Sequence, residues 1–224
     1  MKIYFPTLSS CTLFEGISND ALSAMLDCLG ASVLSFSKGK SIFLEGDPAT
    51  RLGILLSGTA QITRVDYDGN RSIVATLGAG ELFGESFACA GVARLPVSVE
   101  AVSDAEVMLI DSLRITKTCT NACEFHSRII YNLMRTLAQK NLQFNSKLEI
   151  TSKRSTREKL IAFLFAEARK HSSKSFSIPY DRQSLADYLG VDRSGLSAEI
   201  GKLCREGIIA CEKNRFELLD LSLR

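Results

Sequence analysis

Residues 120–150 contain neither glycine nor proline, and this long uninterrupted segment constrains the fold more than any other feature of the chain. It predicts a single helix about 45 Å long, at about 1.5 Å per residue. A helix that outruns the domain before it exposes part of its surface, so we expect the same helix of a second copy to cover its apolar seam. The alternative is that the seam packs on the chain's own preceding domain. The predicted dimer interface comprises Ile130, Leu133, Leu137, Asn141 and Phe144.

The region before this helix has the sequence pattern of a β-sheet domain. Turns that contain glycine separate short runs rich in strand-forming residues, and Asp68-Gly69-Asn70 is a strong hairpin signal. Many short strands between such turns predict a closed sandwich or roll, interrupted by a short helix over residues 84–90. A first helix over residues 18–29 precedes them, with Ser18 as N-cap and Gly30 at its end. The predicted strands cover residues 31–36, 41–44, 52–56, 60–65, 72–77, 97–101 and 106–110.

Two capped helices joined by a glycine turn lie near the C-terminal end of the sequence. Asp181 is placed to cap a helix over residues 182–189, and Gly190 supplies a tight turn. Asp192 then caps a second helix over residues 193–206, whose outward side is polar. Two short helices separated by such a turn are typical of a helix-turn-helix.

The segments around this helix pair complete a winged helix-turn-helix. An amphipathic helix over residues 155–170 and a polar loop over residues 171–175 precede it. Two short strands joined by the turn at residues 212–215 follow it and form the predicted wing. A helical hairpin inside a core would not carry polar side chains along its second helix, so we expect DNA binding. The predicted base contacts are Arg193, Ser194 and Ser197, and the predicted phosphate contacts are Gln183, Ser184 and Lys202, with Lys213 and Arg215 in the wing.

The net charge changes sign along the chain and favours the same end for a polyanion. Residues 1–150 hold 13 Lys/Arg and 15 Asp/Glu, a net −2, whereas residues 151–224 hold 14 and 10, a net +4. A basic excess suits a nucleic-acid partner. No apolar run approaches the roughly 18 residues of a membrane span, and the start lacks the pattern of a signal peptide. We therefore expect a cytoplasmic protein with no membrane partner.

Cysteine and histidine usage argues against catalysis and against most metal chemistry. The seven cysteines are irregularly spaced, form no CxxC pair and are expected to be reduced. Only His126 and His171 are present, and no nucleophile–base pair stands out, so we do not expect an enzyme. Cys119, Cys123 and His126 share one helix face, where they could ligate zinc or haem iron or sense thiol oxidation. The simpler interpretation is that they line the start of the long helix.

The order of these parts resembles that of the cAMP receptor protein and fumarate–nitrate reductase regulator (Crp/Fnr) family. The resemblance covers nearly the whole chain, and the segments that carry it are 38–39, 42–49, 56–58, 80–85 and 181–193. It implies a homodimeric transcription regulator that binds a palindromic operator in double-stranded DNA, works with RNA polymerase and responds to a small-molecule effector. The implied fold is α+β: a cyclic-nucleotide-binding-like β-roll (jelly roll) that senses the effector over residues 1–119, a dimerisation helix over residues 120–151, and a winged helix-turn-helix over residues 152–224.

The effector site is where the sequence departs from the family. In members that bind a cyclic nucleotide, a Glu takes a ribose hydroxyl, and a later Arg followed by Ser or Thr holds the phosphate. Here Leu95-Pro96 stands at the Arg-Ser/Thr position, with Arg94 one place early. A phosphate without a bidentate Arg loses its strongest partner, so we expect an effector other than cAMP. The predicted effector-binding residues are Phe83, Gly84, Glu85, Ser86 and Arg94; the alternative for Glu85 is a structural carboxylate.

Two other functions stay open at this point. Oxygen sensors of the family ligate an iron–sulfur cluster through an N-terminal cysteine cluster, but only Cys11 and Cys28 lie near that end, so we do not expect a cluster. A haem-, metal- or thiol-based sensor would use Cys119, Cys123 and His126 instead. The other function is a cyclic-nucleotide-like module that regulates a protein partner, and the winged helix-turn-helix with its basic bias argues against it.

Overall fold

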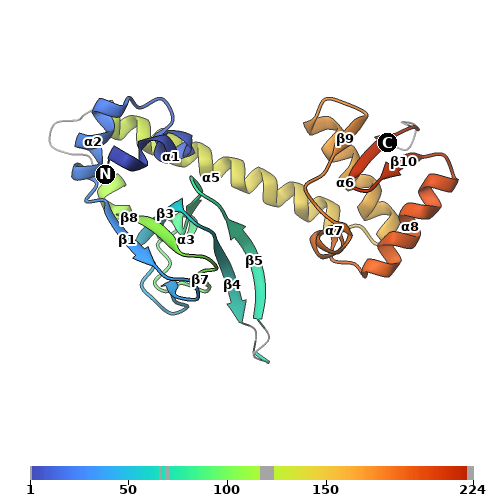
Figure 1. Cartoon of the computed structure of the whole chain (residues 1–224), viewed down its shortest axis with the longest axis horizontal. Coiled ribbons are helices and arrows are strands. Elements are labelled where there is room, and N and C mark those ends of the chain that lie inside the picture. The colour runs from blue at the N-terminus through green and yellow to red at the C-terminus, as the bar shows by residue number, and fades with distance from the viewer. Residues whose placement is uncertain (1, 66, 69–70, 117–123, 221–224) are drawn as a thin grey trace. The chain divides into compact units, whose positions relative to one another are not determined.

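A computed structural model describes residues 2–65, 67–68, 71–116 and 124–220 of the chain (Figure 1). The chain divides into two compact units, Met1–Gln139 and Lys140–Arg224. The long predicted helix is α5, Glu124–Thr151, which begins in the N-terminal unit and ends in the C-terminal unit. None of the described helices combines the length and the hydropathy that crossing a membrane requires.

The N-terminal unit is a roll of two antiparallel sheets, which confirms the predicted roll. Its described strands are β1 Ser32–Phe36, β2 Ser41–Phe43, β3 Arg51–Ser57, β4 Ala60–Val65, β5 Arg71–Leu77, β6 Leu82–Phe83, β7 Ser98–Ala101 and β8 Ala105–Asp111. One sheet has the order β1-β8-β3-β6 and the other β2-β7-β4-β5. Every predicted run forms a strand, whereas β6 was missed because two residues are too few to show an alternating pattern. The predicted short helix is α3, Glu85–Cys89.

Apolar side chains from both sheets fill the inside of the roll. The rings of Phe43 and Phe83 meet edge to face with their centres 5.5 Å apart, next to Leu55 and Val107. Gly53 on β3 is required here, because a Cβ at this position would lie 2.2 Å from Cζ of Phe83. The ring of Phe83 therefore packs directly against the backbone of β3.

Helices at the N-terminus form a second core with the other side of the roll. They are the 3₁₀ turns η1 Lys2–Tyr4 and η2 Thr12–Phe14, and the helices α1 Phe5–Ser10 and α2 Asn19–Cys28. The helix α4, Ser112–Thr116, follows β8 and adds Ile115 to the same core. The predicted helix at residues 18–29 is α2, and the Ser18 hydroxyl accepts from the backbone N–H of Ala21 at 3.4 Å. It is not the first helix, however, since η1, α1 and η2 precede it. These elements of three to six residues are too short to show a helical period.

The first half of α5 is anchored to the N-terminal unit through polar as well as apolar contacts. The buried Asn132 side chain donates to the carbonyl oxygens of Leu13 at 3.0 Å and of Glu15 at 2.9 Å. The hydroxyls of Thr136 and Thr12 lie 3.0 Å apart. One face of the first half of α5 therefore packs against its own N-terminal unit.

The C-terminal unit contains a second core of its own. Its described elements after α5 are α6 Thr156–Lys170, β9 Ser175–Ser177, α7 Arg182–Leu189, α8 Arg193–Arg205, β10 Ile209–Glu212 and β11 Arg215–Leu218. The strands form one antiparallel sheet with the order β10-β11-β9. The predicted loop at residues 171–175 is partly wrong, because Ser175 begins β9. Phe176 is buried opposite Phe216 of β11. Pairing with this distant strand therefore makes residues 175–177 a strand, although the residues before them are polar.

Candidate DNA interface and effector region

The two helices of the helix-turn-helix begin at the predicted aspartate caps. The Asp181 carboxylate accepts from the backbone N–H of Ser184 at 2.7 Å, and Asp192 accepts from that of Gly195 at 2.8 Å. The N–H of Ser184 lowers the pKa of Asp181, and the Ser194 hydroxyl, followed by the N–H of Gly195, lowers the pKa of Asp192. Both carboxylates are therefore ionised at neutral pH and favour helix formation at the end where the backbone N–H groups point outward.

Apolar packing holds α7 against α8 and leaves the other side of α8 for a ligand. Gly190 makes the turn between them with a φ of 61°, a left-handed conformation that favours glycine. The buried residues of the two helices are Leu185, Ala186, Leu189, Leu196, Ile200 and Leu203. With these side chains inside, the outward face of α8 carries the polar residues near its N-terminus.

Two cations on α6 also hold the helix pair in place, and sequence reasoning missed both. Arg157 donates to the carboxylate of Glu199 at 3.1 Å and also pairs with Glu206. The ammonium of Lys159 donates to the carbonyl oxygen of Leu189, at the C-terminal end of α7, at 3.2 Å. A cation is favourable there because helix carbonyls point outward at that end. Partners on separate helices leave no periodic signal in the sequence.

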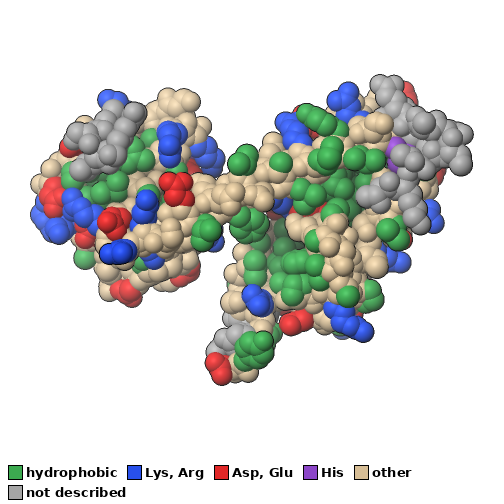
Figure 2. All heavy atoms as spheres, turned by 180° about the vertical axis from the view of Figure 1, so that it is seen from behind, with side chains coloured by type: hydrophobic (Ala, Val, Ile, Leu, Met, Phe, Trp, Pro, Cys, Tyr) green, Lys and Arg blue, Asp and Glu red, His purple; other side chains and the backbone are tan. Residues whose placement is uncertain are grey.

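The side chains predicted to contact DNA are all exposed on the C-terminal unit: Gln183, Ser184, Arg193, Ser194, Ser197, Lys202, Lys213 and Arg215. They come from α7, α8 and the β10–β11 wing, as predicted. Figure 2 shows the Lys and Arg side chains of this unit interspersed with Asp and Glu. The face of the C-terminal unit drawn in Figure 2 has no uniformly basic surface. DNA binding by this unit would therefore depend on the positions of individual Lys and Arg side chains.

Three of these side chains already take part in local hydrogen bonds. The Ser194 hydroxyl donates to Asp192, so its oxygen is left to accept. Gln183 donates to Asp187 at 2.9 Å, one helical turn further along α7. Arg215 donates to the Ser175 hydroxyl at 3.3 Å, which holds the wing strand against β9.

The predicted dimer seam divides between two faces of α5. Leu133 is only 5% exposed in the core of its own unit, so its assignment to the dimer interface is corrected. The next residue, Met134, is 58% exposed and points about 100° further around the helix. Hydrophobic side chains also lie at the surface further along α5 (Figure 2). Ile130 and Leu137 are half-buried against the core of their own unit, as the alternative of intramolecular packing predicts, whereas Met134, Phe144 and Leu148 are exposed. Together with the polar Asn141 they form a stripe along α5 with alternating steps of four and three residues: Ile130, Met134, Leu137, Asn141, Phe144 and Leu148.

The residues predicted to bind an effector are distributed between the interior and the surface of the roll. Phe83 belongs to the core, and Gly84 has a φ of 77° at the start of α3. Glu85 is only 2% exposed, and the Ser86 hydroxyl donates to its carboxylate at 3.3 Å. Glu85 therefore has local partners, as the alternative of a structural carboxylate predicts.

Leu95, which the sequence resemblance places at the phosphate-binding arginine, is a core residue. Leu95 is 4% exposed and packs with Phe43 and Phe83 inside the roll. Its backbone N–H donates to the carbonyl of Asp47 at 2.8 Å. The neighbouring Arg94 is exposed, and its guanidinium donates to the carbonyl of Gly46 at 2.7 Å. Arg94 is thus engaged with the loop that precedes β3.

Of the predicted Cys119–Cys123–His126 set, the two cysteines lie outside the described residues. His126 is buried at the start of α5, and its Nε2 lies 4.0 Å from the sulfur of Cys28. Among the described residues, no group of three or more His, Cys, Asp or Glu side chains could hold a metal ion.

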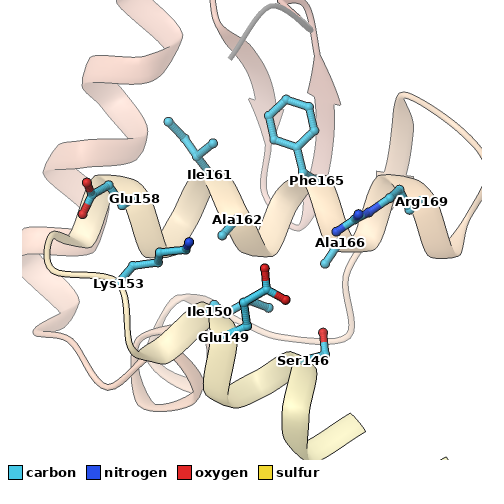
Figure 3. A pocket seen from close by; sticks show the side chains of 10 residues that line it. All are labelled: Ser146, Glu149, Ile150, Lys153, Glu158, Ile161, Ala162, Phe165, Ala166 and Arg169. Carbon is cyan, nitrogen blue, oxygen red and sulfur yellow. The ribbon is translucent and has the colours of Figure 1, made fainter. Parts of the chain in front are cut away.

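A hollow of about 660 Å³ lies between the end of α5 and the outer face of α6 (Figure 3). Figure 3 shows the Glu149 side chain pointing from α5 toward α6. The residues lining the hollow are Ser146, Glu149, Ile150, Lys153, Glu158, Ile161, Ala162, Phe165, Ala166 and Arg169. None of the predicted effector residues lies here, since all of them belong to the N-terminal unit.

Two family models match the chain in the expected order. The cyclic nucleotide-binding domain matches residues 33–121, and the Crp-like helix-turn-helix domain matches residues 158–223. The nitrogen fixation regulation protein FixK of Bradyrhizobium diazoefficiens is 28% identical over 190 residues, which cover 83% of this chain and 77% of that protein. The cyclic AMP receptor protein of Thermus thermophilus is 24% identical over 214 residues, 94% of each chain.

Solved structures share the fold at lower identity. A structure of CprK in complex with OCPA has a TM-score of 0.65 at 15% identity and covers 89% of this chain and 90% of that one. The c-di-GMP-responsive regulator CLP of Xanthomonas campestris has a TM-score of 0.59 at 19% identity, covering 90% and 100%. From the order of the two matched domains and from the two sequence relatives, which match 83% and 94% of this chain, we conclude that this chain belongs to the Crp/Fnr family of transcription regulators, in which an effector-binding domain controls a DNA-binding helix-turn-helix.

Proposed function

We propose that this regulator binds a palindromic operator as a homodimer, recruits or obstructs RNA polymerase there, and responds to a small-molecule effector other than cAMP. The division of labour follows the predicted segments: residues 1–119 sense the effector, residues 120–151 pair the two copies, and residues 152–224 bind DNA. The observation that carries the DNA-binding part is the exposed polar N-terminal end of α8, which begins at Arg193 on a capped helix.

The chemistry of α8 supports separate roles for its cations. Arg193 is the first residue of the helix, where a recognition helix meets base edges, and its guanidinium can donate twice to O6 and N7 of a guanine. Lys202 lies in the last turn of α8 and suits a phosphate, as do Lys213 and Arg215 in the wing. Ser194 would accept from a base donor through its oxygen, because its proton is engaged with Asp192.

The proposal of a homodimer is based on the stripe along α5, in which Met134, Phe144 and Leu148 are exposed. Its members alternate steps of four and three residues, the spacing that keeps a seam facing a partner helix. Phe144 is 68% exposed, a large apolar surface for a single chain to leave in water. Two copies joined along this stripe would present two recognition helices to the half-sites of a palindrome.

The effector proposal rests on Leu95. A cyclic nucleotide needs a cation and backbone donors at its phosphate, but this position carries a buried leucine followed by a proline, which has no N–H to donate. The effector of this protein is therefore a small molecule that does not need that clamp. A calorimetric titration with cAMP tests this part, and binding tighter than about 10 µM, or roughly −7 kcal/mol, would contradict it.

The DNA-binding proposal is tested by selecting bound sequences from a random duplex pool and then titrating the enriched duplex. We expect an inverted repeat with half-site centres about 10 base pairs, or a multiple, apart. At physiological salt, the enriched duplex should bind at least about 10³-fold more tightly than a scrambled one. A pool without an enriched inverted repeat would overturn the proposal.

A further inference from the structure

An arginine of α7 contacts both strands of the wing. Nη2 of Arg182, the first residue of α7, donates to Sγ of Cys211 on β10 at 2.9 Å. The same guanidinium lies over the ring of Phe216 on β11, 5.3 Å from the ring centre. Cys211 and Phe216 are opposite each other in the β10–β11 ladder. One side chain of the helix-turn-helix therefore holds the wing at a single pair of facing residues.

The Cys211 thiol joins this arginine to the turn of the wing. Its sulfur accepts from Arg182 and donates to the carbonyl oxygen of Lys213 at 3.6 Å. A protonated thiol can fill both roles, because it carries one proton and also has lone pairs. Lys213 has a φ of 51°, a left-handed conformation that is uncommon for residues other than glycine. The bond from Cys211 therefore supports the backbone of Lys213 in this conformation.

The other turn residue is attached to the segment that leads into α7. The side-chain amide of Asn214 donates to the carbonyl oxygen of Ile178 at 3.1 Å, and the N–H of Ile178 donates to the carbonyl oxygen of Asn214 at 2.9 Å. Ile178 is buried directly after β9. These two bonds do not involve Arg182. We therefore expect the hairpin to persist without the guanidinium, with Lys213 less restrained.

Lys213 is the wing cation that the turn presents to a partner. It is exposed, whereas the guanidinium of the other wing cation, Arg215, donates to the Ser175 hydroxyl. A side chain on a backbone that is already fixed loses less conformational entropy when it binds. The groups that restrain the Lys213 backbone therefore affect how tightly its ammonium binds a phosphate.

We propose that Arg182 is a positioning residue for DNA binding: through the Cys211 thiol and the Phe216 ring, it holds the wing turn so that Lys213 meets a backbone phosphate. This proposal rests on the proposed DNA-binding function. The alternative is that Arg182, at the start of α7, contacts a phosphate itself. Positioning is favoured because the Arg182 side chain is half-buried and its guanidinium is already engaged by the sulfur and the ring.

A double-variant cycle in the full-length protein separates these two roles. Arg182→Met keeps an unbranched side chain next to Phe216 and removes the charge, and Lys213→Ala removes the wing cation. Both are titrated with the selected operator and with a scrambled duplex at two salt concentrations. Each single variant should weaken both duplexes several-fold, and Lys213→Ala should reduce the salt slope by about one. The double variant should bind no more weakly than Lys213→Ala alone. Cys211→Ala should reproduce the effect of Arg182→Met, including its dependence on Lys213.

Arg205→Met is the matched control, because it removes the same charge from an exposed position in the last turn of α8. Its effect should add to that of Lys213→Ala. Circular dichroism checks that each variant is folded, and Cys211→Ala supplies the cycle if Arg182→Met is not. Additive losses for Arg182→Met and Lys213→Ala would overturn this proposal alone, and so would a Cys211→Ala protein that binds like the wild type. A wild-type protein that selects no operator would overturn the proposed function, and this proposal with it.

Discussion

The two units of this protein differ in where their predicted functional residues lie. In the C-terminal unit the predicted contact side chains are all at the surface, on elements whose caps and turns are local. In the N-terminal unit, Phe83, Glu85 and Leu95 are buried, whereas Ser86 and Arg94 are exposed. A DNA-reading surface needs only the right side chains on one helix face. A ligand site inside a roll shares its positions with the core, so a single substitution can turn a binding position into a packing position.

The largest effect is expected from an arginine at residue 95, where the sequence resemblance places the phosphate-binding arginine. Leu95→Arg places an unpaired charge among Phe43, Phe83 and their neighbours, and we expect it to destabilise the N-terminal unit by several kcal/mol. Urea denaturation followed by circular dichroism measures this loss. The exposed Arg94→Leu is the control and should cost only about 1 kcal/mol, because it removes one exposed hydrogen bond, to the carbonyl of Gly46. A stable Leu95→Arg protein that binds cAMP would contradict the conclusion that residue 95 serves only in core packing.

The exposed stripe of α5 can be tested without disturbing either core. Phe144→Asp should place a charge in the proposed seam and cost several kcal/mol of dimer stability. Sedimentation should then show monomers at micromolar concentration, with loss of operator binding. Leu142→Asp is the matched control, because Leu142 is equally exposed, at 69%, but lies about 160° around the helix from Phe144. Equal effects of both substitutions, or a wild-type protein that sediments as a monomer, would refute the seam.

Arg193 and Lys202 separate base reading from phosphate binding in the C-terminal unit. Arg193→Ala should cost about 1–3 kcal/mol per half-site on the selected operator and relax the preference at one base position. Lys202→Ala should weaken operator and scrambled duplex about equally and reduce the salt dependence of binding. Binding isotherms for both duplexes at two salt concentrations measure these effects. If Arg193→Ala weakens both duplexes equally, base reading belongs to Ser194 and Ser197 instead.

The smallest expected effect concerns the cap of α8 and its pH dependence. The folded-state pKa of Asp192 is lowered, so its stabilising contribution is complete above the unfolded value of about 3.9 and is lost as the pH falls through the lower folded value. Asp192→Ala should lower the thermal midpoint of the C-terminal unit by a few degrees at pH 7 and by less near pH 3. Calorimetry at both pH values tests this. A decrease in the thermal midpoint that is larger near pH 3 than at pH 7 would contradict this prediction.

Local signals explain why the C-terminal unit was largely predictable. The caps at Asp181 and Asp192, the turn at Gly190 and the apolar spacing of α7 and α8 involve neighbours within a few residues, and each is found in the structure. The strands of the roll were also recognisable, because glycine turns mark their ends. What the pattern missed were short elements, such as β6, and strands defined by distant partners, such as β9.

The order of the longer elements, the starts of the capped helices α2, α7 and α8, and the family could be predicted from the sequence alone, because caps, turns and periodic apolar residues act over short distances. Which of two adjacent residues on α5 faces inward depends on tertiary packing: Leu133 lies in the core, whereas Met134 is exposed to solvent. It also places Leu95 in the core and brings Arg182 of α7 to Cys211 of β10. These outcomes depend on contacts between segments far apart in the chain, and periodicity along one segment carries no information about its partners.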